Sequence, residues 1–252
     1  MDARRLGASG PKVSPIGFGA FKIGRNQKTK YGQAYNLPDA AEVSRLLNAL
    51  LDIGITYFDT APAYGLSEER LGAAIGHRRR EFTLSTKAGE IFENGTSTYD
   101  FSPTAIKASV ARSLKRLQTD VLDVLFLHSP GDDLAILNDT DAVPTLLRLR
   151  ESGAVKAIGL SAKTPQGALA ALDWADAIMV EYHLDDRSHE AVIAAAAELG
   201  KGVVIKKGLA AGHLPADEAI QFVLSNSAVS TMIVGSLSLE HMQANLKAAS
   251  TS

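Results

Sequence analysis

The chain of 252 residues contains no cysteine, and this absence removes a whole class of chemistry. Disulfide bridges, thiol nucleophiles and thiolate metal ligands are excluded, so a redox reaction would have to depend on a bound cofactor. The absence is compatible with a reducing compartment, and we expect a cytoplasmic protein.

Long apolar runs and an excess of one charge are also missing. No apolar run approaches the ~20 residues that span a bilayer, and the first five residues lead into no apolar signal segment. There are 26 Lys and Arg against 28 Asp and Glu, a formal net charge of −2, which gives no overall field to hold nucleic acid. The sequence therefore favours a small-molecule partner over a membrane or a nucleic acid, and it leaves the oligomeric state open.

The one dense basic run, residues 77–80, is expected to be a solvated helix end, with a binding patch as the alternative.

What the chain does have is a regular alternation of short β-rich runs and longer helical patterns. Repeated βα units are typical of a parallel sheet covered by helices, and roughly 250 residues suit one α/β barrel, so residues 1–252 are predicted to form a single domain. Strands are predicted at residues 16–19, 57–59, 83–87, 121–128, 157–161, 177–181, 203–206 and 231–235. Helices are predicted at residues 41–51, 68–75, 103–117, 143–151, 165–172, 189–199, 216–224 and 239–248.

An open doubly wound sheet would have the same alternation, and the glycines after the first strand distinguish the two folds. Gly17, Gly19 and Gly24 do not have the G-x-G-x-x-G spacing of a dinucleotide-binding sheet, and a long polar loop follows them. We therefore predict an α/β fold of the (β/α)8 TIM-barrel type. The turn signal at residues 9–11 predicts an N-terminal β-hairpin that closes the bottom of the barrel.

Four polar side chains stand at or just after the ends of predicted strands. Asp59, Lys87 and His128 end the second, third and fourth strands, and Tyr64 lies in the second loop. Taken singly, each has a structural explanation, as a turn cap, a solvated lysine or a satisfied core histidine. In a barrel, however, the carboxyl ends of all strands face one site, so the four are expected to converge.

Together these side chains have a coherent chemistry. A tyrosine phenol has an ordinary pKa of about 10 and becomes a proton donor near neutral pH only when nearby groups tune it. Lys87 would favour the phenolate, Asp59 would hold the lysine, and His128 would hydrogen-bond a substrate oxygen. No histidines and carboxylates cluster at metal-ligand spacing in the sequence, so no metal is expected.

The segments that contain these residues resemble the aldo-keto reductase family. They are residues 54–65 (GITYFDTAPAYG), 85–87 (STK) and 123–128 (DVLFLH), and the likeness runs from Leu6 to Ser236. The resemblance implies NADPH or NADH bound across the strand ends and reduction of an aldehyde or ketone. It also implies that Asp59, Tyr64, Lys87 and His128 are the catalytic residues.

The resemblance extends to the cofactor, but less completely. Ala162 follows Ser161 where the family usually has Ser-Asn, Met179 replaces a glutamine, and Lys206 replaces the aromatic residue that stacks on nicotinamide. A basic pair for the 2′-phosphate is not visible in residues 235–241, so NADP(H) and NAD(H) both stay open. The cofactor-binding residues it implies are Gly19, Ala20, Phe21, Ser161, Ala162, Met179, Lys206, Lys207, Gly208, Leu209, Gly235, Ser236, His241 and Asn245.

Alternatives follow from the same residues. Lys206 could meet a phosphate or a substrate carboxylate, or Lys206 or Lys207 could pair with Glu181. Lys206 or Lys87 could form an imine, as in some barrel lyases. The fold could also bind a nucleotide and report redox state to a partner with little turnover. Aromatic residues of the first loop, Phe21, Tyr31 and Tyr35, are candidates for the pocket wall, with packing on the barrel as the alternative.

Overall fold

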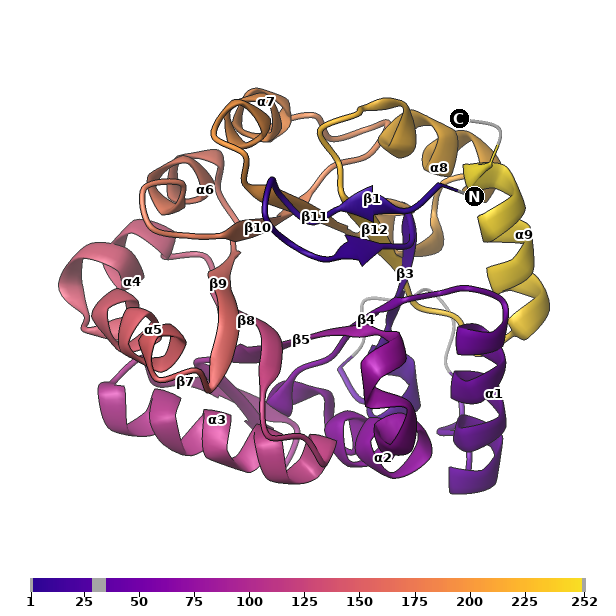
Figure 1. Cartoon of the computed structure of the whole chain (residues 1–252), viewed down its shortest axis with the longest axis horizontal. Helices are drawn as coiled ribbons and strands as arrows, with labels where there is room; N and C mark the ends of the chain where they lie inside the picture. The colour runs from indigo at the N-terminus through magenta and orange to yellow at the C-terminus, as the bar shows by residue number, and fades with distance from the viewer. Residues whose placement is uncertain (1, 29–34, 251–252) are drawn as a thin grey trace.

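Eight parallel strands close into a barrel, as the sequence predicts (Figure 1). The computed structural model describes residues 2–28 and 35–250. Around the barrel the order is β10-β11-β12-β3-β4-β5-β8-β9, so strands that are neighbours in sequence are neighbours in space. Their bounds are β3 (Ile16–Gly19), β4 (Tyr57–Asp59), β5 (Thr83–Ala88), β8 (Leu122–His128), β9 (Val155–Ser161), β10 (Ala177–Glu181), β11 (Gly202–Lys206) and β12 (Thr231–Val234).

Helices form the outer ring in Figure 1. The eight predicted helices are found with ends within one residue of those expected, and α4, in the loop after β8, was not predicted. In the first helix, Asp39 accepts from the Glu42 N–H while the Glu42 carboxylate accepts from the Asp39 N–H, a capping box that fixes where the helix begins. The helices are α1 (Ala40–Asp52), α2 (Ser67–Ile75), α3 (Pro103–Leu117), α4 (Asp133–Asp139), α5 (Ala142–Glu151), α6 (Pro165–Ala171), α7 (Glu190–Glu198), α8 (Ala216–Ser225) and α9 (Leu239–Ala249).

The predicted N-terminal hairpin lies across one end of the barrel (Figure 1). It consists of β1 (Arg4–Arg5) and β2 (Lys12–Val13), paired antiparallel. Leu6 and Val13 are buried against residues from inside the barrel, including Tyr57 and Phe126. The hairpin therefore closes the end where the strands begin and leaves the opposite end for a site.

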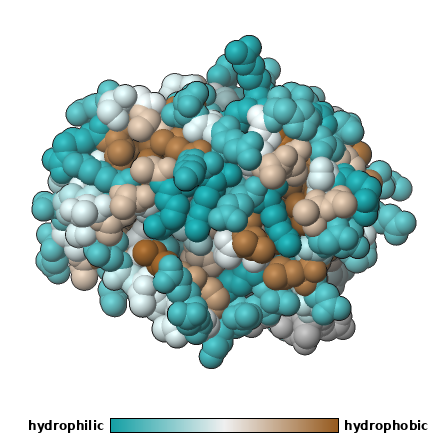
Figure 2. Space-filling model, turned by 90° about the horizontal axis from the view of Figure 1, so that it is seen from below, coloured by the Kyte–Doolittle hydropathy of each residue, from teal (hydrophilic) through white to brown (hydrophobic). Residues whose placement is uncertain are grey.

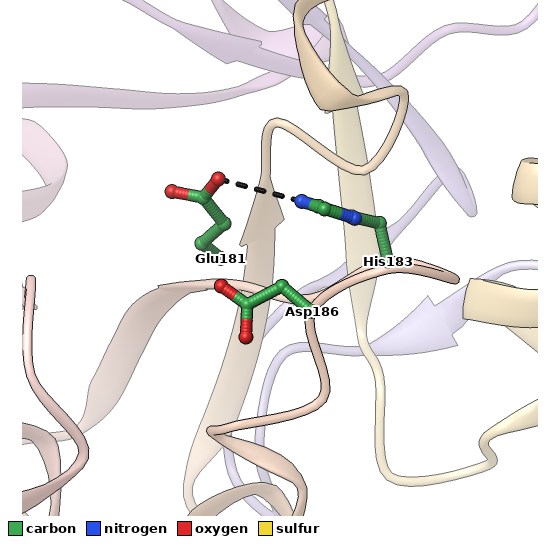
Figure 3. A group of neighbouring side chains, drawn as sticks. All are labelled: Glu181, His183 and Asp186. Atoms are coloured by element: carbon green, nitrogen blue, oxygen red, sulfur yellow. Dashed lines mark ion pairs between the residues drawn. The ribbon is translucent and has the colours of Figure 1, made fainter. Parts of the chain in front are cut away.

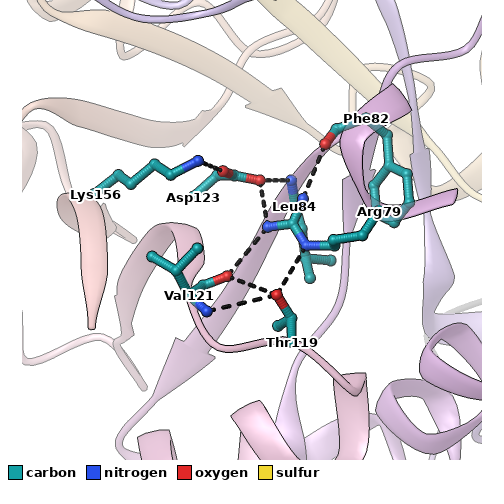
Figure 4. A network of polar contacts seen from close by, with 7 residues as sticks. All are labelled: Arg79, Phe82, Leu84, Thr119, Val121, Asp123 and Lys156. Atoms are coloured by element: carbon teal, nitrogen blue, oxygen red, sulfur yellow. Dashed lines mark hydrogen bonds and ion pairs between the residues drawn. The ribbon is translucent and has the colours of Figure 1, made fainter. Parts of the chain in front are cut away.

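A polar network joins β5 to β8 near the closed end (Figure 4). One oxygen of the Asp123 carboxylate accepts from Arg79 at 2.6 Å and from the Leu84 N–H at 2.8 Å, and the other accepts from Lys156 at 2.8 Å. This corrects the expectation for residues 77–80. His77 and Arg80 are exposed, but Arg79 is drawn inward because its guanidinium completes this network.

Among the described residues, no helix combines the length and apolar character needed to cross a bilayer. The face in Figure 2 is mostly hydrophilic, and its apolar atoms fall in separate small groups.

Candidate active site

A cavity of about 770 Å³ opens at the carboxyl ends of the barrel strands. Every strand of the barrel contributes to its wall, for example Asp59 from β4, Lys87 from β5, His128 from β8 and Lys206 from β11. Its volume lies within the usual range for small-molecule sites, roughly 300–1,000 Å³.

The floor of the cavity holds a buried ion pair. Lys87 Nζ lies 2.6 Å from Asp59 Oδ2 and donates to the Thr60 carbonyl at 2.9 Å. The Ser85 hydroxyl donates to Asp59 Oδ1 at 2.7 Å, and both charged side chains are only 2% exposed. Because both carboxylate oxygens are engaged, the lysine ammonium is fixed in place.

Tyr64 lies over this pair, at the end of a short 3-10 helix, η2 (Pro62–Tyr64). Lys87 Nζ is 4.9 Å from the centre of the tyrosine ring, and the Phe21 ring packs edge-on against Tyr64 at 5.1 Å. The turn out of η2 needs glycine, because Gly65 has φ +60° and a Cβ there would lie 2.4 Å from the Gly24 carbonyl oxygen. The backbone thus holds Tyr64 beside the lysine.

His128 completes the group. Its ring lies edge-on to that of Tyr64, with 6.1 Å between centroids, and its Nδ1 is 2.7 Å from Glu90 Oε2. Burial lowers the pKa of His128 and the Lys87 and Lys206 ammonium groups lower it further, while Glu90 acts in the opposite direction. All four residues predicted to be catalytic are therefore brought together around one cavity.

Glu90 was not anticipated, and it comes from a hairpin that was missed. Strands β6 (Glu90–Glu93) and β7 (Thr96–Tyr99) pair antiparallel after β5, and β6 contacts η2. The turn between them is Asn94-Gly95, with φ +51° and +78°. An Asn-Gly pair flanked by β-forming residues is a strong hairpin signal, so the sequence did contain the information.

On the other side of the cavity, the strand ends present lysines. Lys206 Nζ donates to the Ser161 hydroxyl at 3.0 Å and to the Ala162 carbonyl at 2.6 Å. Burial holds the pKa of Lys206 well below its usual range, and the nearby Lys163, Lys207 and Lys87 lower it further. Of the two lysines considered as partners of Glu181, Lys207 forms the ion pair.

The residues expected to bind the cofactor divide into two groups. The first group does not line the cavity. Ala20 and Ala162 are buried beside its wall, and the Ser236 hydroxyl accepts a hydrogen bond from the Ser238 N–H. His241 is exposed, and Asn245 is buried against Met242. Of the aromatic residues of the first loop, Tyr35 donates to the Arg25 carbonyl and Tyr31 lies outside the described residues. Those that line the cavity are Gly19, Phe21, Ser161, Met179, Lys206, Lys207, Gly208, Leu209 and Gly235.

Three possible metal ligands also come together at the end of β10 and in the loop that follows it (Figure 3). One ligand atom from each of Glu181, His183 and Asp186 lies within 4.8 Å of the others, and Glu181 Oε1 is 3.4 Å from His183 Nε2. The Glu181 carboxylate already pairs with Lys207 as well as His183, so its negative charge is compensated within the chain. The expectation that no metal takes part stays a prediction.

Barrel enzymes hold their active sites at the carboxyl ends of the strands, and this chain has its cavity and the buried Asp59–Lys87 pair at that end. The class so defined is a barrel enzyme for small molecules. The profile of the aldo/keto reductase family matches residues 15–218, and the chain belongs to this family of oxidoreductases.

Relatives of known structure or activity cover most of the chain. PA4992 from Pseudomonas aeruginosa, described as an aldo-keto reductase, superimposes with a TM-score of 0.91 and 40% identity over 99% of this chain and 95% of its own. D-threo-aldose 1-dehydrogenase of a Pseudomonas species is 33% identical over 84% of this chain and 70% of its own length. L-galactose dehydrogenase of Arabidopsis thaliana is 27% identical over 98% of this chain and 88% of its own length.

Proposed function

We propose that this protein is an NAD(P)H-dependent oxidoreductase that reduces an aldehyde or ketone to an alcohol, with Tyr64 as the general acid. The observation that supports this most is the group around Lys87. The Lys87 ammonium lies 2.6 Å from Asp59 Oδ2 and 4.9 Å from the centre of the Tyr64 ring. An otherwise weak acid is thus placed beside a fixed positive charge, which stabilises the phenolate that remains after proton transfer.

The cavity fits a nicotinamide nucleotide in size and in charge. Among the described residues, Lys206 hydrogen-bonds only neutral groups, and Lys163 and Lys207 lie close enough to lower its pKa, so basic side chains gather on this side of the cavity. Such a wall suits the phosphate groups of a nucleotide. We assign Gly19, Ser161, Met179, Gly235 and residues 206–209 to holding it, with Ser236 and His241 nearer the adenosine end. When bound, the nucleotide supplies the hydride.

The residues of this chain then perform the proton chemistry. The Tyr64 hydroxyl donates its proton to the carbonyl oxygen as that oxygen gains negative charge. The Lys87 ammonium stabilises the phenolate, and the Asp59 carboxylate, in turn held by the Ser85 hydroxyl, keeps the lysine in place. His128 binds the carbonyl oxygen and orients it toward Tyr64.

We propose a sugar or a similar polyhydroxylated carbonyl compound as the substrate class. Two relatives bear the names of an aldose and an L-galactose dehydrogenase. The cavity wall on the side of Tyr64 combines aromatic faces, Phe21 and Phe92, with hydroxyl groups of Thr96, Ser97 and Ser129. Aromatic faces next to hydroxyl groups suit a ligand that has both C–H and O–H surfaces.

The first test is a titration of the purified protein with NADPH and then NADH, followed by nicotinamide fluorescence. Micromolar binding of either nucleotide is the expected result and also selects the cofactor. Tyr64→Phe should keep this binding and the circular dichroism spectrum, while carbonyl reduction falls by about 10²–10⁴-fold. Full activity of Tyr64→Phe would overturn the assignment, and tight binding without turnover of any carbonyl would favour the redox-sensing alternative.

One observation favours a second candidate, a lyase that works through an imine on Lys206. The lowered pKa of this lysine, caused by burial and by Lys163, Lys207 and Lys87, would leave more of it as the nucleophilic amine. Borohydride trapping with an aldehyde, read by mass spectrometry, separates the two functions. A stable adduct at Lys206 would support the lyase, and turnover without an adduct supports the reductase.

A further inference from the structure

We propose that Glu90 is a positioning residue for His128. Its carboxylate holds Nδ1 of the imidazole and so leaves Nε2 as the nitrogen that meets the substrate oxygen. This inference rests on the proposed function, in which His128 binds that oxygen. The pair joins a strand of the barrel to the β6–β7 hairpin, which lies outside the barrel.

The two side chains meet in a partly closed space. Nδ1 of His128 and Oε2 of Glu90 are 2.7 Å apart, and the side chains are 14% and 11% exposed. The Nδ1 atom itself is shut off from solvent, and within the described residues no acceptor lies in line with its N–H, so the contact with Glu90 is electrostatic and becomes an ion pair when the ring is protonated. A shielded pair of this kind is weakened little by salt.

The carboxylate is itself held in orientation. The Ser97 hydroxyl, on the paired strand β7, donates to Glu90 Oε1 at 2.6 Å, which leaves Oε2 for His128. The hairpin is held against the first loop because the Arg25 guanidinium stacks 3.2 Å from the centre of the Phe92 ring. Glu90 is therefore a fixed partner rather than a mobile surface side chain.

Fixing Nδ1 decides what the rest of the ring can do. An ionised carboxylate only accepts hydrogen bonds, so Nδ1 keeps its proton. Nε2 then has a lone pair when the ring is neutral and an N–H when the ring is charged. The charged form can donate to a carbonyl oxygen, and the neutral form can accept from an alcohol hydroxyl. Glu90 would thus make the protonation state of His128 decide which partner the ring favours.

The charges that face His128 act in opposite directions. The nearby cations are Lys87 on β5 and Lys206 on β11, and Tyr64 faces the ring from η2. Burial and the two lysines lower the pKa of His128, and Glu90 raises it. Glu90 is thus the acidic group that offsets these lysines.

Glu90 stays ionised over the range that matters. Burial alone would raise its pKa, but His128, Ser97 and Arg25 together bring it to about 2. The Tyr99 hydroxyl also lies near Glu90, and burial and Glu90 raise the pKa of that phenol. Between about pH 5 and 8, the range in which a histidine ordinarily titrates, the partner of His128 is therefore a carboxylate.

The test compares Glu90→Gln with Glu93→Gln, the same substitution at the exposed end of the same strand. In the free protein, the pKa of His128 is read from the NMR titration of its ring protons, assigned as the signal missing in His128→Gln. Glu90→Gln keeps an oxygen near Nδ1 but removes the charge, and the pKa of His128 should fall by about 1 or more. Glu93→Gln should leave it unchanged. An unchanged pKa in Glu90→Gln would overturn the proposal.

Activity provides the second readout. In Glu90→Gln, the fall of kcat/KM for carbonyl reduction on the alkaline side should move to lower pH by the same amount, and Glu90→Asp should restore part of it. If Glu90→Gln does not fold, Ser97→Ala frees the carboxylate to rotate and should give a smaller shift in the same direction, whereas no shift would count against the proposal. The NMR titration needs no turnover, so failure to find a carbonyl substrate would count against the proposed function and not against Glu90.

Discussion

The two sides of the cavity differ in how their charges are balanced. On the side formed by β3, β4, β5 and β8, the buried charges come in pairs, Asp59 with Lys87 and Glu90 with His128. On the side formed by β9 to β12, Lys207 pairs with Glu181, but Lys206 hydrogen-bonds the neutral Ser161 hydroxyl and Ala162 carbonyl.

This difference separates two tasks. Paired charges are held rigidly before any ligand arrives, which is what a proton-transfer group needs. An ammonium such as that of Lys206, held by neutral oxygens, lowers the stability of the folded protein until an anion binds, which is what a site for phosphate groups needs. Aromatic residues follow the same division, because Phe21, Tyr64, Phe92 and Tyr99 all come from the first side. Within the described chain, none of the residues that line the cavity from β9 to β12 is aromatic.

The strongest test of the paired side is Lys87→Met. The substitution removes the ammonium beside Tyr64, and carbonyl reduction should fall by about 10²–10⁴-fold, which corresponds to about 3–5 kcal/mol of activation free energy. It also leaves the Asp59 carboxylate, 1% exposed, without its cation, so the free energy of unfolding should fall too.

The double variant Asp59→Asn with Lys87→Met separates the two effects. Because both charges are gone, urea unfolding should show stability close to that of the unmodified protein, while activity stays low. If the double variant regained activity, the ion pair would be a scaffold feature and not part of the proton chemistry.

The sequence predicted the paired side better than the lysine side, for a physical reason. Asp59, Lys87 and His128 stand at the ends of apolar strands, and barrel geometry brings such ends together whatever their separation in the chain. Glu90 was missed because it lies two residues beyond the end of β5, in the β6–β7 hairpin, which is outside the repeating βα pattern. The Asn94-Gly95 turn was the signal for that hairpin.

On the lysine side, sequence spacing could not decide between partners. Lys206 and Lys207 are adjacent, and which of them meets Glu181 depends on the direction of each side chain at the strand end. Lys207 has φ +55°, so the backbone turns there and brings its ammonium to Glu181, while Lys206, still in β11, reaches Ser161. Asn245 is buried against Met242, and this position likewise depends on how α9 packs, which the local sequence pattern does not predict.

A second prediction concerns the scaffold beneath the paired side. Asp123→Ala would leave the half-buried Arg79 guanidinium and the buried Leu84 N–H without their shared acceptor. The free energy of unfolding should fall by about 3 kcal/mol, measured by urea denaturation. The network lies near the other end of the barrel from the cavity, so turnover per folded molecule should not change at a temperature where the variant is folded.

Lys156→Met is the matched control for this network. Its ammonium contacts the other oxygen of Asp123, but the side chain is 62% exposed. Solvent weakens such a contact, so the loss should stay below about 1 kcal/mol. Equal losses in the two variants would mean that the buried geometry of Figure 4 does not set the strength of the network.

A smaller effect than those at Lys87 and Asp123 is expected for Lys206→Met, which tests the side of the cavity formed by β9 to β12. Removing one cation and its link to Ser161 should weaken nucleotide binding by about tenfold with little change in kcat, measured by the fluorescence titration and by steady-state kinetics.

The same substitution should also change how the free energy of unfolding depends on pH. Because the pKa of Lys206 is lowered in the folded protein, the unfolded chain binds more protons between that value and the usual 10.5, and the unmodified protein gains stability as pH rises through this window. The methionine variant lacks this gain, so its stability relative to the unmodified protein should be greatest near pH 7 and should decrease toward pH 10. A difference that stays constant with pH would show that Lys206 titrates normally and that this side of the cavity is not under electrostatic strain.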